Sequence, residues 1–373
     1  MKSIYLIILL TALLGACSSG KARLEKGDYD VAVYRAVKRL QQKPNHHKAE
    51  KVLREAYLLA VDGHMDKIEY YDNSGSQFKF DKMVNEYEHI QALNNAIRRY
   101  PKYANLLKLT EVSNEIGLFS SKAASSHFNK GNELLDLGTK DWARKAYNHF
   151  TIANRFESGF VSTKQLDFAL QAGTVNVVLE FTSNRRFSVD YNAEHLYEHV
   201  YNGFRNSNYK FLRVVEPSEI DFDPDEIIQI EMEEAHIGRV DVSRNVFEMT
   251  KEDVYMGEAE TDSGEVVKVY GEVTADYIEF CKTINTRSSL YIERINGNNS
   301  AVIHRRTIPS SYNWTEKWAT YRGDKRALTA SQLDFVTRKE PRSPDREWLF
   351  AQTTKPLIDN SCNFLRNQYS HLR

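Results

Sequence analysis

Several features that would connect this sequence to a known chemistry are missing. Its 373 residues include three cysteines, and no two of them are spaced as the paired ligands of a zinc site. The chain has no glycine-rich loop followed by lysine to hold a phosphate, and no G-x-S-x-G turn to present a nucleophilic serine. We therefore expect a protein that is not an enzyme and that carries no cofactor and no metal.

An excess of charge of one sign is also missing. Fifty lysines and arginines stand against 51 aspartates and glutamates, which gives a formal net charge of −1. Nucleic-acid binding depends on a basic surface, so we do not expect nucleic acid as a partner. Aromatic residues make up 12% of the chain and charged residues 27%, a composition typical of folded domains with real cores.

Long apolar runs are absent after the first twenty residues. Lys2 precedes an apolar stretch over residues 4–14, which has the length of a signal-peptide core and is too short to cross a bilayer. Leu14 lies three residues before Cys17, with glycine and alanine between them. This motif resembles the lipobox of bacterial lipoproteins. An ordinary cleaved signal peptide with a chance cysteine is the alternative.

The lipoprotein resemblance implies a signal peptide over residues 1–16, an acylated Cys17, and a short tether over residues 17–21. Several acyl chains, at ~0.8 kcal/mol per buried methylene, anchor a protein stably to a membrane. No acidic residue follows Cys17 directly, since the next four residues are Ser, Ser, Gly and Lys. In lipoproteins of Bacteroidota-like organisms an acidic stretch at this place implies export to the cell surface. We therefore expect the periplasmic face of the outer membrane.

Proline is scarce in the first half of the chain. Only Pro44 and Pro101 of the eight prolines precede residue 200, and each follows a stretch with helical spacing of apolar residues. This pattern predicts a helical domain over residues 22–172. Gly27, Ala32 and Pro44 resemble the second half of a tetratricopeptide repeat, and residues 124–156 resemble a second repeat.

The repeat resemblance implies stacked antiparallel helices with Gly138 at a turn, and with a concave surface that holds protein segments. A helical bundle without repeats is the alternative.

The pattern changes to short strands after Gly173. Residues 175–181 are rich in β-branched side chains, and from Ile227 apolar and polar residues alternate. Asn296 and Gly297 begin the strongest hairpin signal, and tight turns favour antiparallel pairing. The predicted fold is therefore an all-α tetratricopeptide-like domain (22–172) followed by an α+β domain with a mainly antiparallel sheet (173–373).

Two groups of side chains are candidates for a site. His195, Glu198 and His199 form H-x-x-E-H, in which two imidazoles one helical turn apart reach one zinc ion; exposed histidines without a metal are the favoured interpretation. Trp314, Trp318 and Tyr321 form an interface for protein or sugar if they are exposed, and part of the core if they are buried.

The two remaining cysteines, Cys281 and Cys362, form either one disulfide or two separate buried thiols.

Together these features predict a lipid-anchored scaffold or assembly lipoprotein. Its expected partners are other envelope proteins of an outer-membrane complex that serves protein insertion, secretion or gliding. A glycan-binding lipoprotein that uses Trp314 and Trp318 is one alternative. A zinc-dependent hydrolase that uses His195 and His199 is the other.

Overall fold

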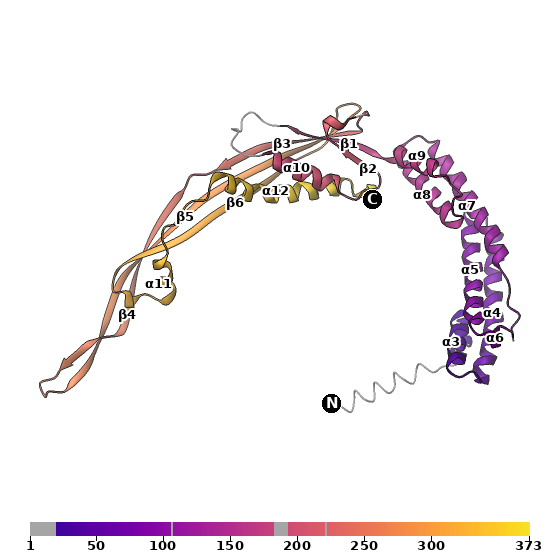
Figure 1. Cartoon of the computed structure of the whole chain (residues 1–373), viewed down its shortest axis with the longest axis horizontal. Coiled ribbons are helices and arrows are strands. Elements are labelled where there is room, and N and C mark those ends of the chain that lie inside the picture. Colours follow the sequence, from indigo (N-terminus) through magenta and orange to yellow (C-terminus); the bar gives the residue numbers. More distant parts are fainter. Residues whose placement is uncertain (1–19, 106, 183–192, 221) are drawn as a thin grey trace. The chain divides into compact units, whose positions relative to one another are not determined.

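The computed structural model describes residues 20–105, 107–182, 193–220 and 222–373 (Figure 1). Cys17 and the predicted signal peptide (residues 1–16) lie outside the described residues. The chain divides into two compact units, Met1–Gly173 and Thr174–Arg373, which are treated separately below. Among the described helices, none is both long enough and apolar enough to cross a membrane.

The first unit is a succession of helices, each packed against the next long one. Helix α3 contacts α4, α4 contacts α5, α5 contacts α7, α7 contacts α8, and α8 contacts α9 (Figure 1). Their bounds are α2 Lys21–Leu24, α3 Tyr29–Gln42, α4 His47–Asp72, α5 Lys79–Arg98, α6 Pro101–Ala104, α7 Ser113–Leu135, α8 Lys140–Phe156 and α9 Thr163–Gly173.

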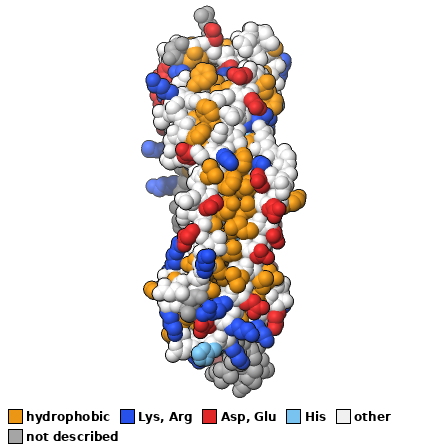
Figure 2. Space-filling model, turned by 90° about the vertical axis from the view of Figure 1, so that its right-hand side faces the viewer, with side chains coloured by type: hydrophobic (Ala, Val, Ile, Leu, Met, Phe, Trp, Pro, Cys, Tyr) orange, Lys and Arg blue, Asp and Glu red, His pale blue; other side chains and the backbone are white. Residues whose placement is uncertain are grey.

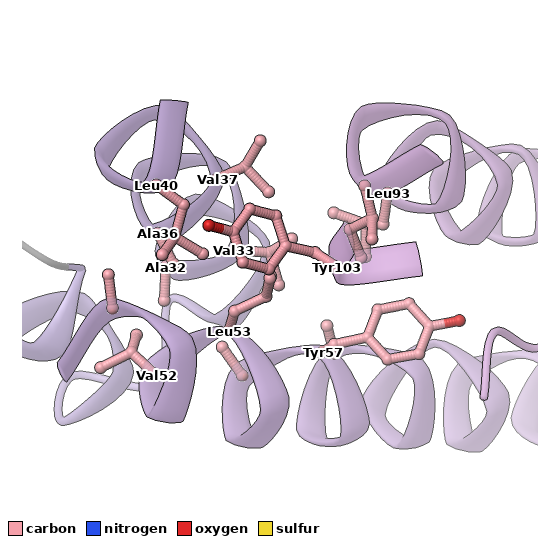
Figure 3. Packing of buried hydrophobic residues seen from close by; sticks show 14 residues of the cluster. Ala32, Val33, Ala36, Val37, Leu40, Val52, Leu53, Tyr57, Leu93 and Tyr103 are labelled. Carbon is pink, nitrogen blue, oxygen red and sulfur yellow. The ribbon is translucent and has the colours of Figure 1, made fainter. Parts of the chain in front are cut away.

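The core of the first helices follows from the spacing of small and branched residues on α3. Ala32, Val33, Ala36, Val37 and Leu40 recur at helical spacing and are all buried, so one face of α3 packs on α4 and α5. Figure 3 shows these side chains, with the ring of the buried Tyr103 reaching toward them from the short helix α6.

A close approach of α7 and α8 depends on a glycine. Gly131 lies on α7, and a Cβ atom built there would come within 2.4 Å of the ring of Phe150, which is fully buried on α8. The turn between these helices contains Gly138 with a φ of 68°, a left-handed conformation that glycine adopts without strain. The predicted turn at Gly138 is confirmed.

The described residues of the second unit form one six-stranded sheet with helices packed on it. The strand order is β2-β1-β3-β5-β4, and β6 also pairs with β5. The bounds are β1 Val175–Thr182, α10 Ala193–Arg205, β2 Leu212–Val215, η2 Pro217–Glu219, β3 Glu226–Ile237, β4 Asp241–Glu260, β5 Val266–Asn296, β6 Val302–Gly323, η3 Lys325–Ala327, α11 Ala330–Thr337, α12 Arg346–Gln368 and η4 Ser370–Leu372.

The predicted fold class is wrong. The chain is 50% helical and 28% strand, with all six strands in one mixed sheet. Strand β1 is parallel to both β2 and β3, and among the described strands only the pairs made by β5 are antiparallel. The physical reason is the helix α10 between β1 and β2, since parallel neighbours need such a crossover connection. The longer helices of the first unit also vary from 11 residues in α9 to 26 in α4, and α2 and α6 have four residues each, so they do not repeat one unit.

Strand β5 organises the sheet because it is 31 residues long and pairs along both edges. Strand β3 pairs with its residues 286–296 and β4 with its residues 266–283, so these two strands follow one another along the same edge. Strand β6 pairs with residues 275–295 on the other edge. Before residue 275, over residues 266–274, β5 pairs with β4 alone, and these two strands extend together past the end of β6 (Figure 1).

The helices α11 and α12 cover opposite faces of this sheet. Residues 273, 275 and 277 of β5 are buried in a cluster with α11, whereas residues 284, 286, 290 and 292 are buried where α12 packs. The pairing with β6 shows no register shift between residues 275 and 294, so odd and even residues point to opposite faces. The chain therefore crosses from one face to the other between the two helices.

We predict that replacing Gly131 destabilises the protein by overpacking. Gly117 lies on the same helix with open space around it, so Gly117→Ala is a matched control for Gly131→Ala. Both changes gain the same helix propensity, and only Gly131→Ala forces the Phe150 ring to move. The Gly131→Ala protein should be less stable than the Gly117→Ala protein by about 1–3 kcal/mol in denaturant unfolding. Equal stabilities would show that α7 and α8 are not packed this closely.

Candidate interaction surfaces

The aromatic residues predicted from the sequence do not form one exposed surface. Trp318 is only 8% exposed, and its ring stacks on Phe280 at 5.2 Å between centroids. Trp314 lies half-buried on the same face of the sheet, opposite Ile284. Tyr321 is 37% exposed and belongs to the other face, because it is three residues from Trp318 along β6.

The ring of the buried Trp318 makes a cation–π contact with Lys282. Lys282 lies 5.6 Å from the centre of its ring, and the ammonium is in turn bonded to Glu340 and to the Pro341 carbonyl, at 3.0 Å from the latter. The chain between α11 and α12 thus covers this face of the tryptophan. The arrangement makes Trp318 part of the core.

The histidines of the H-x-x-E-H motif lie on the exposed side of α10. The ring centroids of His195 and His199 lie 4.0 Å apart with the rings tilted by 31°, and Nδ1 of His199 lies 2.8 Å from the carbonyl oxygen of His195. Within the described residues, no group of three or more His, Cys, Asp and Glu side chains is arranged to hold a metal ion.

The two cysteines of the second unit are free thiols on opposite sides of the sheet. Cys281 is an odd-numbered residue of β5, on the face that α12 does not cover. Cys362 is buried on α12, and a Cβ atom at Gly203 of α10 would come within 2.6 Å of its sulfur. Burial raises the pKa of the Cys362 thiol. The structure therefore places these residues as separate thiols.

A buried histidine joins three helices of the first unit. His64 of α4 is 5% exposed; its Nδ1 lies 2.6 Å from a carboxylate oxygen of Glu86 on α5, and its Nε2 lies 3.1 Å from one of Asp30 on α3. The hydrogen bond to Asp30 raises the pKa of His64, and the hydrogen bond from His64 lowers the pKa of Asp30. A pocket of about 430 Å³, lined by residues of α3 and α4, opens beside His64 and Asp30.

This geometry fits a structural tie better than a catalytic site. Both ring nitrogens of His64 already face a carboxylate, so neither is available to ligate a metal or to take a proton from a substrate unless a partner leaves. None of the three residues is near another in sequence, and no local motif signals the contact.

A second histidine contact follows one helix pair later. Nε2 of His127 on α7 lies 2.9 Å from Asp81 of α5, and its Nδ1 lies 2.8 Å from Nδ1 of His149 on α8. Phe78 stacks on the His127 ring at 4.4 Å. Burial, followed by the charge of His127, lowers the pKa of His149. The contribution of His149 to the free energy of unfolding therefore changes with pH in the opposite sense to that of His64.

The most exposed apolar surface of the second unit lies on the two-stranded part of the sheet. We call residues 251–274 the distal ribbon, because β4 and β5 pair there without β6. Large apolar side chains are open to solvent on both of its faces: Tyr255 (45% exposed), Met256 (51%), Val266 (62%), Val267 (41%), Val269 (40%) and Tyr270 (57%). Exposed apolar side chains that cluster in this way typically mark interaction sites.

The distal ribbon is also strongly acidic. It contains two lysines, Lys251 and Lys268, and seven acidic residues: Glu252, Asp253, Glu258, Glu260, Asp262, Glu265 and Glu272. A chain that is nearly neutral as a whole thus concentrates negative charge where its apolar side chains are exposed. Such a surface favours a basic partner and disfavours an anionic one.

The helical unit exposes apolar side chains as well. Leu58 is 64% exposed, Tyr70 72% and Leu118 54%. Figure 2 shows hydrophobic side chains gathered along the middle of one face of the molecule, with acidic and basic residues on both sides of them. Some aromatic rings that pack against the core of this unit also contact a lysine. The ammonium of Lys122, for example, lies 4.9 Å from the centre of the Phe119 ring.

Comparison with protein-family models finds no match for this chain, and comparison with curated proteins finds none either. Its function is therefore inferred from its own residues and their geometry.

We predict that the contribution of His64 to stability depends on pH. Its pKa is raised on folding, so the contribution is complete below pH about 6.5 and is lost as the pH rises through the folded pKa. Because the pKa of Asp30 is lowered, the same contact weakens again when acid protonates that carboxylate. The variant His64→Gln should lose about 2 kcal/mol of unfolding free energy near pH 6 and less near pH 9.

Urea unfolding at a series of pH values measures this difference, and His199→Gln on the surface of α10 is the control, expected to change stability by less than about 0.5 kcal/mol. Taking the difference from the wild type cancels the opposite effect of His149. A loss that is constant from pH 5 to pH 9 would contradict the assignment.

Proposed function

We propose that this protein is a lipid-anchored envelope lipoprotein that binds other envelope proteins. Acylation of Cys17 attaches it to the periplasmic face of the outer membrane, and the distal ribbon provides a docking surface for a partner in an outer-membrane complex. The proposal assigns no catalytic residue and no cofactor.

The observation that carries the proposal is the exposure of valine and tyrosine on both faces of the distal ribbon. Val266 and Tyr270 are each more than half exposed, although both have high strand propensity and would gain free energy by burial. In the described part of the chain no helix or further strand covers residues 266–270. A partner that covers them removes this surface from water and supplies the driving force for binding.

The membrane attachment depends on the first residues of the chain. The lipobox-like motif before Cys17 supports it. Helix α2 begins at Lys21, the last residue of the predicted tether, with Gly20 as its N-cap. Acyl chains hold the first unit near the bilayer, so a partner of the second unit is expected in the same membrane or beside it.

We predict that Cys17→Ser releases the protein from membranes. Without the thiol no acyl chain is attached, so the variant should move from the membrane fraction to the soluble fraction, or keep its signal peptide. Fractionation and mass spectrometry of the native protein measure both results. Cys281→Ser is the control and should remain in the membrane fraction. A wild-type protein with an unmodified Cys17 would contradict the anchor.

We predict that polar substitutions on the distal ribbon abolish partner binding without unfolding the protein. The double variant Val266→Thr, Tyr270→Thr keeps strand propensity but removes two exposed apolar side chains. A stoichiometric partner that copurifies with the wild type after mild detergent extraction should be lost. Val302→Thr, Ile303→Thr is a matched control, because both residues are 44% exposed on β6 away from the distal ribbon. A wild type that purifies as a lone monomer would contradict the proposed function.

A further inference from the structure

One edge of β5 has no partner strand over the length of the distal ribbon. Pairing with β6 ends where Ala275 meets Gly323, and the last backbone hydrogen bond on this side runs from the Asp324 amide to the Thr274 carbonyl at 3.0 Å. The chain then leaves this edge at η3, where Arg326 reaches β4 and donates a hydrogen bond to the Tyr255 carbonyl at 2.7 Å. Among the described residues, no strand pairs with residues 266–273 on this edge.

The backbone groups that face this edge belong to the even-numbered residues. In an antiparallel strand the N–H and C=O of one residue point to the same side, and successive residues alternate. The Thr274 carbonyl points to the free edge, whereas the Glu265 carbonyl accepts from the Thr261 amide and points toward β4. Val266, Lys268, Tyr270 and Glu272 therefore present unpaired amides and carbonyls outward.

The other edge of the distal ribbon is irregular. Strand β4 has two bulges, between Lys251 and Val254 and between Tyr255 and Gly257, while β5 runs through the same region with no extra residue. Within these bulges Asp253 has a φ of 59° and Gly257 a φ of 143°. Bulges twist an edge and disrupt its ladder, which protects it against pairing. Only the β5 edge offers a regular row of hydrogen-bonding groups.

A third strand would also supply what the distal ribbon lacks. An isolated two-stranded hairpin is marginally stable in water, and three strands with an apolar face are the usual minimum for independent stability. A strand added to residues 266–273 would continue the line of β6 and bring the distal ribbon to three strands. Its side chains would lie next to Val266 and Tyr270 on one face and next to Val267 and Val269 on the other.

We infer that the free edge of β5 over residues 266–273 receives an extended, basic segment of a partner protein, which joins the sheet as an added strand in line with β6. This inference rests on the proposed function and names the mode of binding and the chemistry of the partner. Main-chain hydrogen bonds supply affinity in such strand addition, and the side chains supply specificity.

The charge of the distal ribbon identifies the occupant. Its seven carboxylates favour lysine and arginine in the added strand, and they disfavour a second copy of this chain that approaches with its own acidic ribbon. Apolar residues of the added strand, placed between its basic residues, would pack against Val266, Val269 and Tyr270. The expected segment therefore alternates basic and apolar or β-branched residues.

The test uses the full-length protein and a synthetic ten-residue peptide of alternating valine and lysine, with a valine–glutamate peptide of the same length as the charge control. Fluorescence anisotropy should show binding of the lysine peptide that weakens with salt, and no binding of the glutamate peptide. Lys268→Pro removes one outward amide and leaves the ladder to β4 intact, so affinity should fall about tenfold. The substitution makes the ribbon more acidic, so loss of charge attraction would not explain the fall.

Two further variants separate edge pairing from loss of fold. Lys268→Ala keeps the amide and should bind the peptide at least as tightly as the wild type. Glu258 lies opposite Lys268, so its own amide points to the outer edge of β4, and Glu258→Pro should weaken binding less than about twofold. Equal binding of both peptides, or an affinity unchanged in Lys268→Pro, would overturn the inference.

The inference and the proposed function fail in different ways. If the native partner copurifies with wild type and with Lys268→Pro alike, docking stands and strand addition is wrong. If no partner copurifies and no peptide binds, both are wrong.

Discussion

The need of backbone amides and carbonyls for hydrogen-bond partners is the constraint on which the second unit depends. Strand β5 is longer than each strand beside it, so no single neighbour pairs with its whole length. Strands β3 and β4 pair with successive parts of one edge, and β6 pairs with part of the other edge. Where β6 ends, one row of these groups is left to solvent. The same length that holds the sheet together thus leaves an unpaired edge, and charge and bulges protect the distal ribbon only in part.

The first unit solves a different problem, which is how to hold helices of unequal length in one stack. Small residues such as Ala32 and Gly131 allow close packing. Buried histidines connect α4 to α3 and α5, and α7 to α5 and α8. The hydrogen bond to Asp30 raises the pKa of His64 and burial lowers the pKa of His149, so the stability contributions of the two histidines change in opposite senses with pH. In the proposed function, this unit is the folded segment that follows the lipid anchor in the chain.

Part of this structure follows from local sequence patterns. Alternation after Ile227 predicts β3, and the Asn296–Gly297 signal predicts the turn between β5 and β6, because both depend on neighbouring residues. The parallel pairing of β1 with β2 and β3 was missed, although a helix between two strands is the connection it requires. The His64 contact and the unpaired β5 edge were also missed. Each depends on residues far apart in the chain, such as Asp30 with His64 and Thr274 with Asp324, and no local period encodes them.

Hydrogen–deuterium exchange across residues 266–273 tests the central claim most directly. The measurement compares the purified full-length protein with the same protein in its native membrane complex, and residues 286–296, paired on both edges, serve as the internal reference. The account predicts that the even-numbered amides of residues 266–272 exchange rapidly in the purified protein and are protected in the complex. Equal, rapid exchange in both samples, with a partner present, would contradict it.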